Sequence, residues 1–195
     1  DYPNSRENFD NLIIFLFELL DKCKINIKEI DNIFVIGKTS GHLYQSEFFR
    51  EIMKIYEGPS PEINLFNEKN NGLSVQKLIA DKLVNSVHDV SSGGILVALS
   101  EMCISSKIGA KIKVPYDKIN LHEYLFGEDQ SRYLVEIKEE NKDKVSNILK
   151  ENGIYYEIVG KTQKDSLEIN KDLNIKITEL NELNSSWFKK YFEEN

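Results

Sequence analysis

The chain has 195 residues, of which 41% are hydrophobic and 29% charged, and its formal net charge is −7. This composition is typical of one large globular domain and excludes a disordered chain. The acidic balance argues against nucleic acid or an anionic membrane surface as the main partner. The apolar run at residues 12–20 is too short to span a bilayer, which takes about 20 residues, and no secretory signal opens the sequence.

Cysteine and histidine are sparse and scattered. The two cysteines, Cys23 and Cys103, and the three histidines lack the closely spaced pairs that a zinc site needs, so we predict no metal site. Cys103 lies in an apolar helical run, where a buried free thiol is common. Reduced thiols indicate a soluble, cytoplasmic protein.

The first predicted element is an amphipathic helix over residues 6–22, because apolar side chains recur there at helical spacing. We expect residues 1–30 to form a helical extension packed on the domain, and a partner interface is the alternative. A short apolar run at 33–36, ended by Gly37, predicts a strand followed by a loop.

Two further helices are predicted before the middle of the chain. Ser46 is placed to cap a helix over residues 46–57, which Gly58 and the prolines after it would end. A helix through residues 69–82 then leads to a strand before His88.

The second half alternates strands and helices. An apolar helix follows Gly94, and residues 110–114 and 132–137 read as strands. Asn141 or Asp143 could cap a helix over 144–152, which Gly153 would end.

The last part of the chain clusters strands before a final helix. A β-branched strand is predicted at 154–159, and residues 167–169 and 174–177 would form a hairpin. Ser185 or Ser186 would cap a terminal helix. This order predicts an α/β (α+β) sandwich with a mixed sheet, in a single domain over residues 31–195.

The junction of strand and helix at residues 87–101 is the first candidate site. Gly93 and Gly94 leave the backbone accessible, and Ser91 or Ser92 could accept from the first free amides of the helix. A phosphate or carboxylate could bind there, whereas the alternative is a tight turn that needs glycine for steric reasons alone. Asp89 would by default act as a capping charge at this helix end.

A second anion-binding concavity is possible in the loop after the first strand. Gly37, Thr39, Ser40 and Gly41 could supply it, with Lys38 adding positive charge. The Walker spacing is absent, so the loop does not indicate a free-standing nucleotide site.

A third candidate is the acidic turn before the strand at 132–137. Arg132 could bind a carboxylate or phosphate with two hydrogen bonds, or it could pair with Glu128, and the sequence favours neither.

Four segments in the same order resemble one enzyme family. HDVSSGGILVALSEM, beginning at His88, is similar to the HDVSDGGL-type segment in the C-terminal domain of aminoimidazole-ribonucleotide synthetase and its relatives. LFGEDQSRYLV resembles the LFGE-x-QSR segment of one branch, the large subunit of phosphoribosylformylglycinamidine synthase. IGKTSGHLYQSEFFREI and GPSPEINLFNEKNNGLSVQKLI resemble that branch's IGET-x-GHLGQSEYLREI and G-x-PP-x-VDL-x-x-E-x-x-NG stretches. The resemblance covers about Ile33 to Ile137.

Three positions depart from the family pattern. Lys38 stands where the family usually has Glu, and Tyr44 where it usually has Gly. Ser92 replaces the usual Asp before the glycine pair, which weakens metal binding at this turn and leaves its amides available to an anion.

The resemblance implies a three-layer α/β/α fold with a mixed sheet, partly ferredoxin-like, as the last domain of a longer enzyme. The whole enzyme would use ATP and Mg²⁺ to activate the amide oxygen of formylglycinamide ribonucleotide, and ammonia from a glutaminase partner would displace phosphate. ATP and Mg²⁺ would bind mainly on N-terminal-type domains outside this chain. The chain alone would hold no catalytic residue, no metal and no cofactor, and would be inactive.

The resemblance also implies two sets of site residues. The first would face the substrate cleft and comprises His88, Asp89, Ser91, Gly93 and Gly94. The second would shape or brace the cleft and comprises Gly127, Glu128, Ser131 and Arg132.

Two alternatives remain at this stage. The chain could belong to a relative with another substrate, such as selenophosphate synthetase, thiamine-phosphate kinase or a hydrogenase-maturation protein, although the LFGEDQSR and GHLYQS segments favour the purine enzyme. It could also be a non-catalytic interaction domain, which the apolar 6–22 segment and Ser92 would favour.

Overall fold

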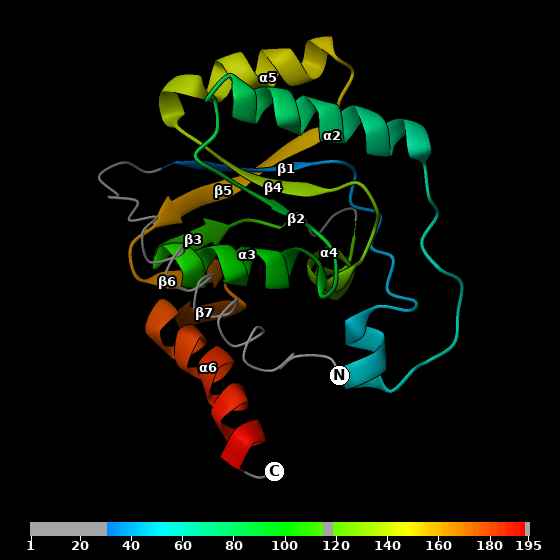
Figure 1. The fold of residues 1–195 in the computed structure, drawn as a ribbon, viewed down its shortest axis with the longest axis vertical. Coiled ribbons are helices and arrows are strands. Elements are labelled where there is room, and N and C mark those ends of the chain that lie inside the picture. Colours follow the sequence, from blue (N-terminus) through cyan, green and yellow to red (C-terminus); the bar gives the residue numbers. More distant parts are fainter. Residues whose placement is uncertain (1–30, 115–118, 194–195) are drawn as a thin grey trace, which may run out of the picture.

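A computed structural model describes residues 31–114 and 119–193 and shows one mixed β-sheet with helices on both faces (Figure 1). The sheet has the strand order β2-β4-β1-β5-β3-β6-β7, and β3 and β6 form a parallel pair among antiparallel neighbours. The strands are β1 (Asn32–Ile36), β2 (Ser86–Asp89), β3 (Gly109–Ile112), β4 (Tyr133–Ile137), β5 (Tyr156–Gln163), β6 (Ser166–Ile169) and β7 (Leu173–Lys176). The predicted mixed sheet is confirmed.

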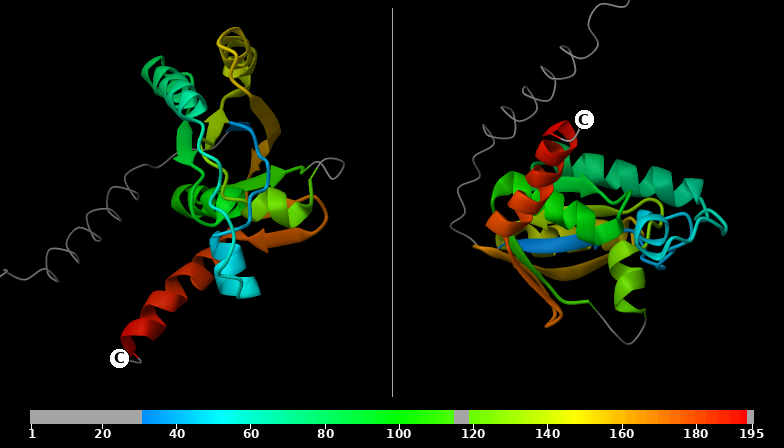
Figure 2. Two further views of the ribbon diagram at one scale, coloured as in Figure 1. Left: turned by 90° about the vertical axis from the view of Figure 1, so that its right-hand side faces the viewer. Right: turned by 90° about the horizontal axis from the view of Figure 1, so that it is seen from below.

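The helices divide between the two faces. They are η1 (Phe48–Met53, a π-helix), α2 (Leu65–Ala80), α3 (Gly94–Ser106), α4 (Leu121–Phe126), η2 (Glu139–Asn141, a 3₁₀ turn), α5 (Lys142–Glu151) and α6 (Ile177–Glu193). Figure 1 shows α2 and α5 on one face of the sheet and α3 and α4 on the other. In Figure 2, α6 extends away from the body of the fold.

Side-chain alternation along β1 produces the three layers. Ile33 and Val35 pack in one core cluster with Leu99 of α3. Phe34 and Ile36 point to the other face, into a second cluster with α2 and α5. Because successive side chains of a strand point to opposite faces, a central strand with apolar residues at every position requires a helical layer on each side. The α/β/α prediction is confirmed.

Several element predictions match the structure closely. The strand at 33–36 is β1, and the hairpin at 167–177 is the antiparallel pair β6–β7. Gly153 ends α5 at φ +66°: its amide donates to the Lys150 carbonyl at 3.0 Å, and the next amide, of Ile154, donates to Leu149. Asn141 is the N-terminal cap position of α5, although its side chain makes no capping hydrogen bond.

The helix predicted over 46–57 is wrong. The Phe49 amide does donate to the Ser46 hydroxyl, at 3.2 Å, but regular structure is confined to η1 and ends at Lys54, which adopts φ +56°. No residue of η1 is buried. Residues 51–60 are exposed and lead to Gly58 and Pro59. Because burial of an apolar face is what stabilises most protein helices, the helix does not extend through this segment.

One helix start was mispredicted and one helix was missed. The terminal helix starts at Ile177, and Ser185 is one of its interior residues, because its hydroxyl donates to the Asn181 carbonyl at 2.8 Å. Helix α4 was missed. Its signal is Asn120 followed three residues later by Glu123, whose carboxylate accepts the Asn120 amide at 3.2 Å.

The predicted helix over 6–22 lies outside the described residues, and so do the side chains of Trp187 and Phe188. Within residues 31–114 and 119–193, no helix combines the length and apolar character needed to cross a membrane.

Candidate functional site

Glu128 closes the glycine corner at the start of α3. Its Oε1 accepts the Gly93 amide at 2.8 Å and the Glu47 amide at 2.8 Å. The Gly94 amide donates to the Ser91 carbonyl at 3.1 Å, and no serine side chain caps the helix. The Gly93 amide, which was predicted to be available to a ligand, therefore donates to a carboxylate of this chain. The predicted serine cap is wrong.

The glycine pair serves close backbone packing. Gly94 adopts φ +70°, and a Cβ atom there would lie 2.6 Å from the Leu125 carbonyl oxygen and 2.8 Å from that of Gly127. The group that approaches this backbone is the C-terminal end of the chain's own α4, with Gly127 after it. The structure thus supports the steric alternative, in which glycine is needed for a tight junction.

Asp129 fills the second predicted concavity in the same way. Its Oδ2 accepts the amides of Ser40 at 3.0 Å and Gly41 at 2.9 Å, and its Oδ1 accepts the His42 amide at 3.2 Å. Three converging amides make an anion-binding nest, and here the anion is an aspartate from 87 to 89 residues further along the chain.

Arg132 stabilises the acidic turn that carries Asp129. It is 1% exposed, donates through Nη2 to the Gly127 carbonyl at 2.5 Å and through Nη1 to the Thr39 hydroxyl at 3.3 Å, and lies 3.7 Å from an Asp129 carboxylate oxygen. Burial lowers the pKa of Arg132, and the nearby Asp129 charge opposes that shift. Arg132 therefore pairs with a carboxylate, but with that of Asp129 rather than Glu128, and at 3.7 Å rather than through two short hydrogen bonds. Its guanidinium is buried in the fold.

A cavity of about 620 Å³ lies beside these carboxylates, between the loop after β1, the start of α2 and the turn before β4. Its lining is Lys38, Ser40, Gly41, His42, Leu43, Tyr44, Phe49, Pro61, Glu62, Asn64, Asn67, Asn71, Glu123, Asp129, Gln130 and Ser131. Lys38 is exposed and is the single lysine or arginine among these residues. Since Asp129 is held by three amides and Arg132, the Lys38 ammonium remains a charged group that can meet an anion.

Three asparagines line one side of this cavity and were missed by the sequence analysis. Asn64 caps α2 by accepting the Asn67 amide at 3.0 Å, and Asn71 donates to the Ser131 carbonyl at 2.8 Å. Their positions at i, i+3 and i+7 place them on one helical face, and this spacing was the available signal. With Gln130 they make the cavity polar and rich in amide groups.

The predicted cleft residues at 88–94 lie outside this cavity lining. The His88 ring lies with Nε2 3.1 Å from a Glu101 carboxylate oxygen, and Nδ1 2.6 Å from the Asp89 carbonyl oxygen. Asp89 and Ser91 are exposed. Their predicted contact with substrate stays a prediction.

The bracing residues are placed differently. Ser131 lines the cavity, Gly127 accepts from Arg132, and Glu128 joins α3 to the segment before η1. The turn therefore shapes the cavity wall by holding the loop that forms it.

The described residues do not fit a metal centre. Across residues 31–114 and 119–193, no group of three His, Cys, Asp or Glu side chains converges as a metal site would require. The two carboxylates nearest the loop, Glu128 and Asp129, already accept backbone amides. These residues would not hold Mg²⁺.

The model of the family "AIR synthase related protein, C-terminal domain" matches residues 33–171. The chain is 48% identical over 170 residues to phosphoribosylformylglycinamidine synthase subunit PurL of Pelagibacter ubique, covering 87% of this chain and 23% of that protein. It is 37% identical over 163 residues to the same subunit of Rhodopseudomonas palustris, covering 84% of this chain and 22% of that protein. The chain thus spans less than a quarter of these relatives.

Solved structures agree on the fold. The structure of T. maritima PurL complexed with FGAR is similar, with a TM-score of 0.67 and 17% identity, over 81% of this chain and 29% of that one. T. maritima PurL complexed with ATP has a TM-score of 0.60 over 81% of this chain and 26% of that one, at 18% identity.

Proposed function

Because the chain belongs to the family of AIR synthase related C-terminal domains, we propose that it works as the C-terminal domain of a phosphoribosylformylglycinamidine synthase and forms one wall of that enzyme's ribonucleotide cleft. The observation that carries this proposal is the polar cavity of about 620 Å³ between the loop after β1 and the turn before β4. The LFGEDQSR and GHLYQS segments border it, and both fall within the family match.

The whole enzyme would transfer the terminal phosphoryl group of ATP to the amide oxygen of formylglycinamide ribonucleotide. Ammonia released from glutamine by a glutaminase partner would then displace phosphate and leave the amidine. ATP and Mg²⁺ would bind on other domains, in keeping with the carboxylates here being taken up by amides. We assign the reaction to the cytoplasm, where the buried free thiol of Cys103 stays reduced.

This chain's own residues would bind and orient the ribonucleotide. Lys38 would pair with an anionic group of the ligand, and the amide side chains of Asn64, Asn67 and Gln130 would hydrogen-bond its neutral polar groups. Glu128 and Asp129 would act indirectly, since they fix the loop that carries Lys38. His88, Asp89 and Ser91 remain candidates for contact with ligand atoms that extend past the cavity.

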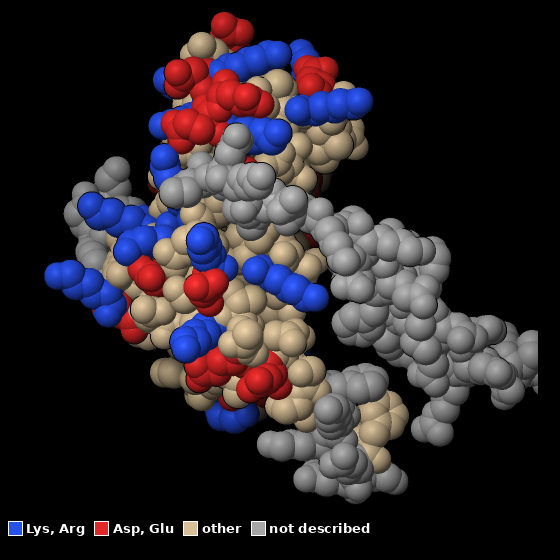
Figure 3. Space-filling model, turned by 90° about the vertical axis from the view of Figure 1, so that its left-hand side faces the viewer, with Lys and Arg blue, Asp and Glu red and all other residues tan. Residues whose placement is uncertain are grey.

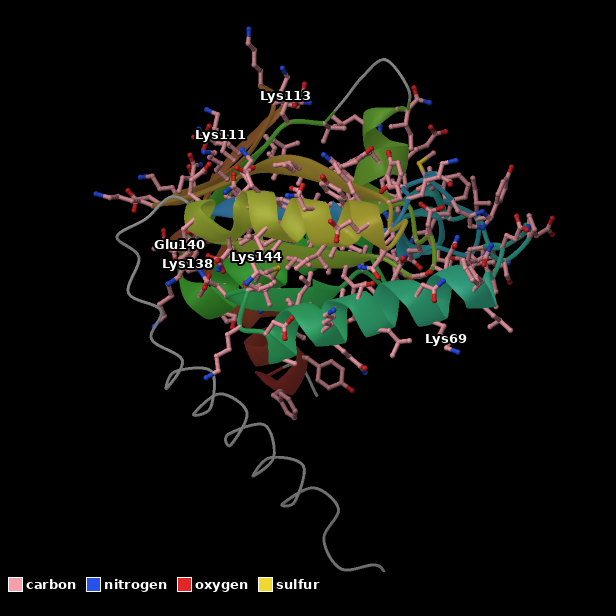
Figure 4. All side chains as sticks on the ribbon, turned by 90° about the horizontal axis from the view of Figure 1, so that it is seen from above. Lys69, Lys111, Lys113, Lys138, Glu140 and Lys144 are labelled. Atoms are coloured by element: carbon pink, nitrogen blue, oxygen red, sulfur yellow. The ribbon has the colours of Figure 1, made fainter. Side chains whose placement is uncertain are left out.

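Binding to the 195-residue chain tests this proposal directly. In ¹⁵N NMR titrations, formylglycinamide ribonucleotide should shift the amides of residues 38–44 saturably, whereas ATP should not bind tightly. Lys38→Ala should weaken ribonucleotide binding at least about tenfold, the value of one charge-assisted contact. Lys144→Ala is the matched control, because Lys144 is an exposed lysine on α5, away from the cavity lining (Figure 4). The proposal would be overturned if the ribonucleotide caused no saturable shift or if both variants lost the same ribonucleotide affinity. Tight ATP binding would also overturn it.

The alternatives give different results in the same assay. A selenophosphate synthetase or thiamine-phosphate kinase would not select this ribonucleotide, and the 37–48% identity to PurL subunits favours the purine enzyme. A non-catalytic interaction domain would leave residues 38–44 unshifted by either compound.

A further inference from the structure

We propose that an exposed apolar strip along residues 52–66 is the surface on which the rest of a full-length synthase docks, so that docking covers the mouth of the candidate cavity. The strip consists of Ile52, Met53, Ile55, Tyr56, Ile63, Leu65 and Phe66. This inference builds on the proposed function, which makes the chain one part of a longer protein.

The strip is far more exposed than apolar side chains usually are. Leu65 is 76% exposed, Phe66 75%, Ile52 68% and Ile63 66%. Single exposed apolar residues are ordinary on protein surfaces, whereas seven large ones within fifteen residues of sequence are unusual. Gatherings of exposed apolar side chains are typical of interaction sites. Figure 3 shows a different face, where Lys and Arg side chains alternate with Asp and Glu over much of the surface, as on a solvated face.

The strip is continuous with the cavity. Pro61, Glu62 and Asn64 line the cavity, and their sequence neighbours Ile63 and Leu65 belong to the strip, so one stretch of chain contributes to both. A partner seated on the strip would therefore lie at the cavity's edge. This is where the second wall of a substrate cleft has to be.

The segment between η1 and α2 is tied to the body through the cavity loop. The His42 Nε2 atom lies 3.0 Å from the Pro59 carbonyl oxygen, and the Gln45 amide donates to the carbonyls of Gly58 at 3.0 Å and Tyr56 at 3.3 Å. The segment forms no helix or strand of its own over residues 54–64. A partner that contacts this segment would thus also affect the cavity loop, through these hydrogen bonds.

The partner that we propose for the strip is the remainder of the full-length synthase polypeptide. More than three quarters of each PurL relative lies outside the matched segment. A tethered domain meets its docking surface at millimolar effective concentration, which a second copy of this chain would not reach. The strip is also apolar, as expected of an interface that does not come apart.

Mixing experiments test this assignment. The probe is the Pelagibacter ubique relative with its matched segment deleted, titrated with the 195-residue chain and followed by calorimetry and sedimentation velocity. We expect one-to-one binding, weakened at least tenfold by Leu65→Glu or Phe66→Glu. Ile79→Glu is the matched control, since Ile79 is 51% exposed on the same helix but fourteen residues after its first residue, and this substitution should change affinity less than twofold.

Hydrogen exchange supplies a second test that does not depend on folding of the deleted relative. Amides equivalent to residues 52–66 should exchange at least tenfold more slowly in the intact relative than in the isolated chain. The docking proposal would be overturned by equal amide exchange rates in the two proteins or by an equal loss of affinity in Ile79→Glu. Self-association of the chain through Leu65 and Phe66 would also overturn it. Ribonucleotide shifts at residues 38–44 are measured on the chain alone, so their outcome tests the proposed function separately.

Discussion

The glycine corner at the start of α3 can be tested by one matched pair of substitutions. Gly94 and Gly153 have nearly the same backbone conformation, with φ of +70° and +66°. Alanine in this region costs about 1–2 kcal/mol at either site. Alanine also lowers the conformational entropy of the unfolded chain, which favours the folded state, and this effect is common to both sites, so it cancels in the comparison.

The surroundings of the two glycines differ completely. A Cβ atom on Gly94 would lie 2.6 Å and 2.8 Å from the carbonyl oxygens of Leu125 and Gly127, whereas nothing lies within 4 Å of one on Gly153. Both neighbours of Gly94 are backbone atoms that cannot rotate away, so overpacking should add about 1–3 kcal/mol. We therefore expect Gly94→Ala to reduce the free energy of unfolding by about 2 kcal/mol more than Gly153→Ala.

Urea unfolding followed by far-UV circular dichroism measures this difference. With a slope of about 2 kcal/mol per molar urea, the midpoint of Gly94→Ala should fall about 1 M below that of Gly153→Ala. Equal midpoints would refute the reasoning, because they would mean that the corner is open to solvent, as a bare ligand-binding groove would be.

Three further predictions concern carboxylates and a thiol. Glu128→Gln keeps an oxygen that can accept the Gly93 and Glu47 amides but removes the negative charge, so it should lower the free energy of unfolding by about 1 kcal/mol, and this loss should be smaller at high salt. The control is Glu140→Gln, because Glu140 is exposed, and equal urea midpoints for the two variants would contradict the prediction. Burial raises the pKa of Glu136 above its ordinary 4.5, so the contribution of this carboxyl group to stability is fully present below that pH and is lost as the pH rises. Glu136→Gln should therefore become increasingly stabilising as the pH rises above 4.5, and a gain that falls with pH would contradict this. Burial raises the pKa of Cys103 to about 12, so in a Cys23→Ser background Ellman's reagent at about pH 8 should label Cys103 only after unfolding, and rapid native labelling would contradict this.

The core strands were predictable because their patterns are local. Ile33 to Ile36 is a continuous apolar run, and a buried central strand needs no other information. The β6–β7 hairpin and the end of α5 at Gly153 also follow from a few adjacent residues. The helix at η1 was predicted too long. Phe48 does pack on Phe126, with ring centroids 4.5 Å apart, but residues 54–57 carry the same helical pattern and are exposed, so no burial extends the helix through them.

The candidate site was harder because its hydrogen bonds join distant parts of the chain. The two amide-rich turns and the acidic turn were each recognisable from their residues, yet nothing local indicates that Asp129 meets Gly41 across 88 positions. A free amide at a helix start and a filled one have the same sequence signature. The cavity asparagines were overlooked for a similar reason, since only the fold brings α2 against the turn at Ser131.

Two of the departures from the family pattern, Tyr44 and Lys38, have identifiable surroundings in the structure. The Tyr44 ring packs edge-on against Phe49, with centroids 5.5 Å apart, and covers Gly58, where a Cβ atom would lie within 2.1 Å of the ring. The tyrosine at position 44 therefore packs directly on Gly58, whose φ of +128° also favours glycine, within the segment that carries the apolar strip. Lys38 extends from the same loop, whose amides are satisfied by Asp129. With those donors internally paired, the ammonium of Lys38 is the cationic group this loop offers, so changing it should alter ligand affinity while leaving the fold intact.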